Sequence, residues 1–271
     1  KWVDGAIAGS GGVARPGMVS RITGGDPMGA TQFNHGQQAQ ELVEAGLMRS
    51  LENVASEDGW RDIVHPASIL ESCEIDGEIY CVPVNIHSQL WLWLSNDAFE
   101  KAGVAVPTNW DEFIAAAPAL REAGIQPLVI GRQPWQASLA FQTIVASVAG
   151  PEVYGKVFAD KDADAVNGPE MEKAFAALEA ARDMTAGSNV QEWNQATTQV
   201  INGAAGGQIM GDWAQGEFAI AEKVAGEDYT CLPGLGLADI VSTGGDAFYF
   251  PAIDDPEVAA AQEELARVMI S

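Results

Sequence analysis

The chain has 271 residues, of which 47% are hydrophobic and 19% are charged, and its formal net charge at pH 7 is −24. This length and composition are typical of a globular protein with enough apolar material for two cores, and no run approaches the roughly 20 apolar residues of a membrane span. The negative charge would repel nucleic-acid phosphates or an anionic membrane, so we expect no nucleic-acid partner and a neutral ligand.

The first third of the chain predicts alternating strands and helices. In chain order we expect a strand over 2–8, a glycine turn, a helix over 13–22, a buried strand over 29–33, helices over 37–46 and 60–71, a hairpin turning at Asp76-Gly77, and a central strand over 80–84. The early strand, helix, strand succession favours a parallel sheet with crossover helices.

A strand over 90–94 is expected to cross into a second lobe, with the rings of Trp91 and Trp93 one on each face. Residues 96–101 are expected to begin the second lobe. The elements expected after them are a helix over 110–123 whose start is signalled by Thr108 or Asn109, a strand over 127–130, a helix over 135–148, a charged loop over 160–164, a helix over 169–184, a strand over 248–251 and a helix over 256–270. The segment 231–234 is expected to return the chain to the first lobe.

The stretch 193–218 is the most informative part of the sequence. It predicts a helix over 194–201 ending at Asn202-Gly203, a buried strand over 207–210, and a second helix that Asp212 caps together with Gln215. Trp193 and Trp213 mark the two helix entrances. An indole face suits the C–H face of a pyranose, although both residues could equally be core tryptophans.

Three polar residues are further candidates for contact with a ligand. Gln32 and Asn34 lie at the carboxyl end of an expected strand, where open α/β sheets bind ligands, and amides match sugar hydroxyls. Asp246 follows two glycines that would let a ligand approach the backbone, and its carboxylate can accept two hydroxyl protons. The alternatives are ordinary loop amides and a turn aspartate. Trp135 is a secondary candidate, and His87 is interpreted as structural.

The three cysteines leave the disulfide state open. Cys73 and Cys81 flank the expected hairpin, so they form either a disulfide or two buried free thiols. Cys231 has no evident partner.

Several segments together resemble the sugar-binding proteins of bacterial ABC importers, in particular the glucose/mannose-type branch. The most specific is the stretch 193–218, which includes VINGAAGGQIMGDWAQGEF at 200–218. The others, in order, are Gly25-Asp26-Pro27, Gln32-Phe33, 82–87, Leu92-Trp93, PTNWDEF at 107–113, QPWQ at 133–136 and GGDAFYF at 244–250. The resemblance covers essentially the whole chain. It implies an α/β, periplasmic-binding-protein-like (type II) fold with two lobes, 1–89 continued by 240–271, and 90–239, joined by hinge strands near 85–93 and 232–244.

The resemblance also implies a function. A periplasmic, monomeric protein would capture a glucose-like monosaccharide by closure of its lobes and deliver it to an ABC permease, using Gln32, Asn34 and Asp246 from the first lobe and Trp193 and Trp213 from the second. Members of the family begin before Lys1 and continue past Ser271, so we expect a fold that is incomplete at both ends. In the family, a cysteine placed like Cys231 often pairs with one near the C-terminus.

Two other functions compete with import. A glycoside hydrolase needs two carboxyl groups roughly 5–10 Å apart, but Asp212 and Glu217 are better explained as a cap and a surface residue. The sequence has no nucleophile motif, phosphate loop or metal-ligand spacing, so we expect no enzyme, cofactor or metal. A sugar receptor for signalling on the same fold is the third interpretation.

Overall fold

The structure is a computed structural model that describes residues 11–271. The strand expected over 2–8 lies outside the described residues. The chain folds into two compact units: unit 1 comprises the described residues up to His87 together with Thr243–Ser271, and unit 2 comprises Ser88–Ser242. The sequence placed the corresponding boundaries at 89/90 and 239/240. The two crossings fall in β5 (His87–Gln89) and β10 (Ser242–Gly244), which pair with each other.

Unit 1 is built around a small antiparallel sheet. Its other elements are α1 (Gly11–Thr23), β1 (Thr31–Asn34), a 3-10 turn (Gln37–Ala39), α2 (Gln40–Glu44), α3 (Glu52–Glu57), α4 (Trp60–Ile63), α5 (Ala67–Glu71), β2 (Glu74–Ile75), β3 (Glu78–Ile79), β4 (Cys81–Pro83), β11 (Asp246–Tyr249) and α14 (Pro256–Ile270). The sheet order is β1-β11-β4, with both pairings antiparallel. Among the described residues β4 is therefore at one end of the sheet, not central as expected, although Cys81 and Val82 are buried.

The helix expected over 60–71 is instead two short helices, α4 and α5. Pro66 lies between them, and the His65–Pro66 peptide bond is cis. Proline lacks an N–H and disfavours the helical conformation of the preceding residue, so the apolar spacing over 60–71 does not make one helix. Helix α3 was not predicted.

The hairpin between β2 and β3 turns where the sequence places it. Asp76 and Gly77 both have positive φ, 51° and 84°, as a tight type I′ turn requires. A disulfide joins Cys73 to Cys81 across a Cα–Cα distance of 5.1 Å, so the alternative of two free thiols is wrong. Cys231 is a half-buried free thiol.

Unit 2 is larger and contains a four-stranded mixed sheet of order β7-β8-β6-β9. Its elements are β6 (Trp91–Ser95), α6 (Asn96–Lys101), α7 (Trp110–Glu122), β7 (Gln126–Leu128), α8 (Pro134–Ile144), a π turn (Val145–Ala149), α9 (Pro151–Phe158), α10 (Ala163–Val166), α11 (Pro169–Met184), α12 (Trp193–Ile201), β8 (Ala205–Met210), α13 (Ala214–Ile220), β9 (Tyr229–Pro233) and a 3-10 turn (Gly234–Gly236). Within this sheet β7 and β8 pair in parallel, and the pairings of β6 with β8 and with β9 are antiparallel. All six residues of β8 are buried.

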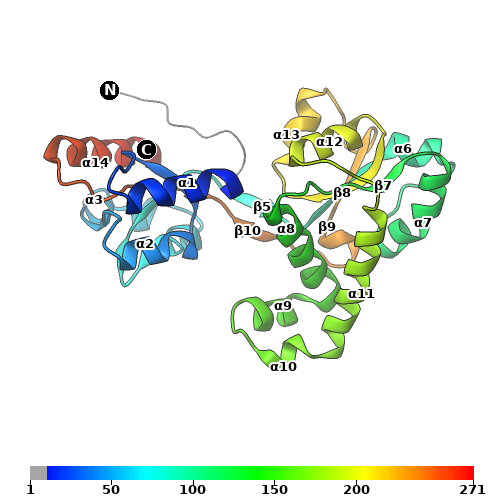
Figure 1. Cartoon of the computed structure of the whole chain (residues 1–271), viewed down its shortest axis with the longest axis horizontal. Coiled ribbons are helices and arrows are strands. Elements are labelled where there is room, and N and C mark those ends of the chain that lie inside the picture. The colour runs from blue at the N-terminus through cyan, green and yellow to red at the C-terminus, as the bar shows by residue number, and fades with distance from the viewer. Residues whose placement is uncertain (1–10) are drawn as a thin grey trace. The chain divides into compact units, whose positions relative to one another are not determined.

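The two faces of this sheet pack against different helices. Leu92 and Leu94 join a core with α6, α7 and α11, whereas Trp93 joins a second core with α12 and α13, which Figure 1 shows close together. The rings of Trp91 and Trp93 lie 6.2 Å apart on the same face, so the expectation of one ring on each face is wrong. Residues two apart in a strand point the same way.

Two expectations about the crossings are corrected. Strand β6 does not cross between lobes, because it pairs with β8 and β9 inside unit 2. Residues 231–234 do not return the chain to unit 1 either; Cys231–Pro233 pair with Trp91–Trp93, and the return follows at 242/243.

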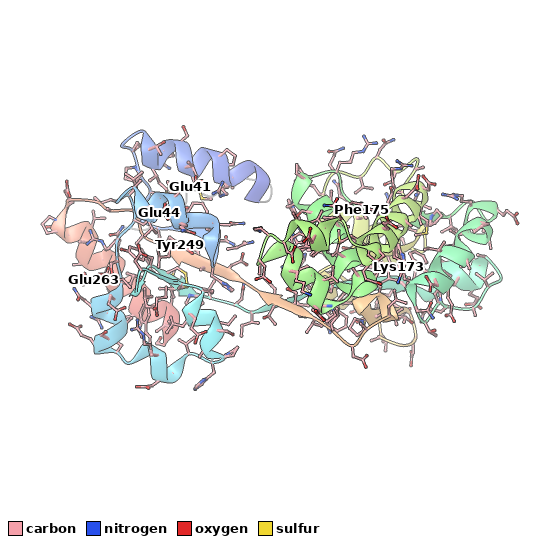
Figure 2. All side chains as sticks on the ribbon, turned by 90° about the horizontal axis from the view of Figure 1, so that it is seen from below. Glu41, Glu44, Lys173, Phe175, Tyr249 and Glu263 are labelled. Atoms are coloured by element: carbon pink, nitrogen blue, oxygen red, sulfur yellow. A yellow bond between two sulfur atoms is a disulfide. The ribbon has the colours of Figure 1, made fainter. Side chains whose placement is uncertain are left out.

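Acidic side chains contribute to the outer helix faces of unit 1. Glu41 and Glu44 are exposed on α2, Glu263 lies on α14, and Tyr249 is fully buried within the same unit (Figure 2). None of the described helices combines the length and apolar character that crossing a bilayer requires.

Candidate ligand-binding site

In unit 1, strand pairing brings sequence-distant polar residues together. Asn34 at the end of β1 is the direct cross-strand partner of Asp246 at the start of β11. Gln32 is exposed on the same face as Asn34, while Thr31 and Phe33 point into the core. Directly opposed residues have Cβ atoms about 5 Å apart, so an amide and a carboxylate stand side by side at this edge.

The Asp246 carboxylate is held by its neighbours yet still partly exposed. Its Oδ2 accepts a hydrogen bond from Asn85 Nδ2 at 2.8 Å and lies 3.3 Å from His87 Nε2. The Asp246 N–H in turn donates to Asn85 Oδ1 at 2.8 Å. The Asp246 side chain keeps 26% of its surface exposed, and a carboxylate has about four acceptor positions. It can therefore accept further hydrogen bonds from a ligand.

The glycine before Asp246 makes room for protein atoms. A Cβ at Gly245 would clash with the Asn85 carbonyl oxygen and would lie 2.8 Å from His35 Nε2. Nδ1 of His35 is 2.7 Å from Ser72 Oγ. Burial lowers the pKa of His35, an effect that the negative charge of Asp246 opposes. The sequence suggested that these glycines let a ligand approach the backbone. At Gly245 the space is instead filled by Asn85 and His35, which pack closely beside the residue before Asp246.

In unit 2, three helices begin beside tryptophans. Trp135 is the second residue of α8, Trp193 is the first of α12, and Trp213 directly precedes α13. All three are half-buried and pack on the same apolar core. The rings of Trp135 and Trp213 are 6.3 Å apart and tilted by 51°. The sequence left open whether these tryptophans belong to the core or contact a ligand. Their half-buried state is compatible with both, because part of each side chain packs on the core and part remains accessible.

A buried amide anchors the start of α12. Gln208 on β8 is fully buried, and its Nε2 donates to the Trp193 carbonyl at 3.0 Å. Its Oε1 lies 2.8 Å from the hydroxyl of Thr197, which is also 3.0 Å from the Trp193 carbonyl. Gly203, with φ of 67°, ends the helix as the sequence predicts.

Asp212 does not cap α13, contrary to expectation. The residue at the cap position is Trp213, without a side-chain cap bond. The Asp212 carboxylate instead accepts hydrogen bonds from the backbone N–H and the hydroxyl of Ser88, at 2.7 and 3.0 Å. The Ser88 hydroxyl also accepts from Trp91 Nε1 at 3.0 Å. Asp212 therefore ties the segment before Trp213 to the strand where the chain enters unit 2.

Two residues beside the tryptophans were missed as site candidates. Gln133 Nε2 lies 2.9 Å from both carboxylate oxygens of Glu192, and Gln133 Oε1 accepts from Trp135 Nε1 at 2.6 Å. The available signals were the polar entrance Gln133-Pro134-Trp135-Gln136 and a carboxylate immediately before Trp193. Over residues 11–271, no cluster of three or more histidine, cysteine, aspartate or glutamate side chains could hold a metal ion.

Two α/β units joined by two chain crossings have the architecture of type II periplasmic solute-binding proteins. The bacterial solute receptor AcbH shares this fold with a TM-score of 0.73 and 19% identity, covering 94% of this chain and 65% of that one. An ABC transporter solute-binding protein from Thermotoga lettingae, bound with α-D-tagatose, gives a TM-score of 0.72 at 18% identity, covering 95% and 66%. Residues 2–262 match the bacterial extracellular solute-binding protein family, and the chain belongs to that family.

Its relatives include two described as probable sugar-binding periplasmic proteins. The one from Brucella melitensis is 38% identical over 264 residues, covering 97% of this chain and 62% of that protein. The one from Rhizobium meliloti is 35% identical over 261 residues, covering 96% and 62%. The chain thus spans 62% of the length of these relatives.

Proposed function

We propose that this protein is the solute-binding component of a bacterial ABC sugar importer, acting in the periplasm as a monomer on a neutral, glucose-like monosaccharide. The observation that carries the proposal is the group of half-buried indoles of Trp135, Trp193 and Trp213 at three helix starts of unit 2. Partly exposed aromatic rings beside polar groups suit the C–H face of a sugar and its hydroxyls. The names of the Brucella and Rhizobium relatives support a sugar ligand.

Glucose is the particular sugar that we propose. The glucose-binding protein GlcS of Saccharolobus solfataricus is 23% identical over 159 residues, covering 56% of this chain and 29% of that protein. The sequence resemblance to the glucose/mannose-type branch points the same way. A neutral sugar also suits a chain with a net charge of −24, which would repel an anionic ligand.

We further propose that the sugar takes contacts from both units. In unit 1 the donors and acceptors are Gln32, Asn34 and Asp246, and in unit 2 the contacts are those of Trp193 and Trp213. A ligand that contacts both units binds best to the closed form, in which the contact residues of both units reach it. Ligand binding therefore shifts the population towards the closed form. That form would be the one that the permease accepts.

The protein is proposed to bind its ligand without altering it. Hydrolysis needs one carboxyl group as an acid and another as a base or nucleophile. The Asp212 carboxylate already accepts two hydrogen bonds from Ser88, which supports a structural role. Incubation with nitrophenyl glycosides should release no nitrophenol; sustained release would contradict this part of the proposal.

The deciding experiment is a titration of intrinsic tryptophan fluorescence with a panel of mono- and disaccharides. Since Trp193 and Trp213 are proposed to meet the ligand, we expect a saturable change with glucose at micromolar or lower concentrations. If only a disaccharide gives a saturable change, the proposal that the ligand is a monosaccharide would be refuted. No response to any sugar, checked by calorimetry, would refute the function.

Trp213→Ala tests the site itself. Removing the indole should weaken glucose binding by about 100-fold or more, which corresponds to about 2.7 kcal/mol. Ile220→Ala is the matched control, because Ile220 is 82% exposed on the same short helix α13. Unchanged calorimetry for Trp213→Ala would remove Trp213 from the site.

A further inference from the structure

The residues at the cap positions of α8 and α12 do not cap their own helices. Gln133 precedes α8 and Glu192 precedes α12, and neither side chain bonds to the N–H groups of the helix that follows it. Instead they bond to each other, with Gln133 Nε2 at 2.9 Å from both Glu192 oxygens. Cap residues usually satisfy free backbone donors, so this side-chain pairing calls for a different explanation.

Two donors and one acceptor fix the orientation of the Gln133 side-chain amide. Its Oε1 accepts hydrogen bonds from Trp135 Nε1 at 2.6 Å and from Gln136 Nε2 at 3.3 Å. Gln136 is fully buried and also donates to the Gln191 carbonyl at 3.1 Å, which ties α8 to the segment before α12. Because the oxygen of Gln133 is used by donors, its NH₂ group must face Glu192.

Glu192 retains capacity to accept more hydrogen bonds. It is half-buried, and among residues 11–271 no cationic side chain pairs with it. Each of its oxygens accepts from the same amide nitrogen, and a carboxylate offers about four acceptor positions. The helix dipole of α12 also stabilises a negative charge at its N-terminus, but this interaction does not explain why an amide orients the carboxylate.

The carboxylate belongs to the same local structure as the indoles. Glu192 directly precedes Trp193, and Gln133 connects it to Trp135, whose ring lies 6.3 Å from that of Trp213. An oriented acceptor beside partly exposed rings is the combination that recognises a neutral polyhydroxy compound.

We propose that Glu192 is a further ligand-contacting residue, which accepts a hydrogen bond from a hydroxyl of a sugar lying against these indoles, and that Gln133 is its positioning residue. The inference rests on the proposed function and deepens it. It also makes Glu192 a specificity determinant, because a carboxylate at this place repels an anionic sugar such as a uronate.

The test combines Glu192→Gln with monodeoxy analogues of glucose, or of whichever monosaccharide of the panel binds most tightly. Glu192→Gln should weaken binding of the parent sugar about tenfold, since a charge-assisted hydrogen bond is replaced by a neutral one. For the one analogue that lacks the hydroxyl bound by Glu192, the variant and the unchanged protein should bind alike. Glucuronate should bind Glu192→Gln better than the unchanged protein.

Gln133→Leu and Glu172→Gln serve as companion variants. Gln133→Leu should reduce discrimination against the same deoxy analogue, because it leaves the Glu192 carboxylate without its orienting amide. Glu172 is exposed on α11, so Glu172→Gln should change nothing.

The outcomes separate this inference from the proposed function. If Glu192→Gln binds every analogue as the unchanged protein does, or weakens all of them equally, the assignment of Glu192 is overturned. In that case a large loss of glucose affinity in Trp213→Ala would still support the proposed function. If the unchanged protein binds no sugar of the panel, the proposed function itself fails.

Discussion

The two units assemble their proposed ligand-binding residues by different means. In unit 1, Asn34 and Asp246 are separated by more than 200 positions and meet only because β1 and β11 pair in one register. In unit 2, Trp135, Trp193 and Trp213 are each placed by the start of a helix. A register slip of one residue would reverse every side chain of a strand, whereas a helix start is set mostly by nearby residues. The polar cluster therefore depends on long-range pairing, whereas the position of each indole at its own helix start depends mostly on local structure.

Among the substitutions that test this comparison, Asp246→Ala in the polar cluster of unit 1 should have the largest effect on sugar binding. It removes the proposed sugar acceptor and leaves Asn85 Nδ2 without the carboxylate it donates to. We expect binding to weaken by roughly 1.5–3 kcal/mol, or about ten- to a hundredfold, measured by calorimetry. Glu41→Ala, on the exposed face of α2 in the same unit (Figure 2), should have no effect. Equal binding by Asp246→Ala and Glu41→Ala would show that the polar cluster is not part of the site.

Gln208→Leu tests whether one helix start controls the indoles. The substitution removes the buried amide that donates to the Trp193 carbonyl. We expect a loss of about 1–3 kcal/mol in the free energy of unfolding, measured by urea denaturation, together with weaker sugar binding. Gln195→Leu is the control, because Gln195 is exposed on the same helix. If Gln208→Leu destabilises the protein but leaves sugar affinity unchanged, Trp193 does not need this anchor to bind the ligand.

The smallest expected effect concerns pH and unit 1. Hydrogen bonds from Arg61, and secondarily from Ser56, lower the pKa of Glu52 from 4.5 to about 2. Because the folded pKa lies below the unfolded value, this ion pair stabilises the fold above about pH 4.5 and loses its contribution as the pH falls towards 2. The side chains of Arg61 and Glu52 are 44% and 27% exposed, so the contribution should stay below about 1 kcal/mol.

The measurement compares Arg61→Ala with the unchanged protein by urea unfolding at pH 7 and pH 3. The stability difference should be larger at pH 7. Arg21→Ala, which removes an exposed arginine paired with Asp26 in the same unit, is the control. A difference that stays constant between the two pH values would contradict the assigned cause.

Local signals predicted many elements of the fold. The helices over 169–184 and 256–270 have the predicted bounds, and Asn109 caps α7 through a hydrogen bond from the Glu112 N–H, as one of the two expected caps. Proline at a helix start and glycine after a helix end act within a few residues, so sequence alone is sufficient to read them. Pro66 also acts locally, and the helix predicted over 60–71 neglected it.

Errors arose where a side chain had two possible partners. The spacing of Asp212 and Gln215 fits a capping box, but the Asp212 carboxylate binds Ser88, more than 120 positions away. Gln133 and Glu192, for which no cap was predicted, also occupy cap positions and pair with each other. A pattern of residue types shows which partners are chemically suitable, whereas only the folded chain decides which of them is within reach.

The sequence by itself determined the family resemblance, most helices, the hairpin turn, and the identity of the indoles and of the acid proposed to meet a sugar. The tertiary structure decided that Cys73 and Cys81 form a disulfide, that the Asp212 carboxylate binds Ser88, and that β11 pairs with β1 so that Asp246 stands beside Asn34. The physical reason is distance along the chain: turns and caps depend on neighbouring residues, whereas strand register and carboxylate partners depend on which distant segments the hydrophobic cores bring together.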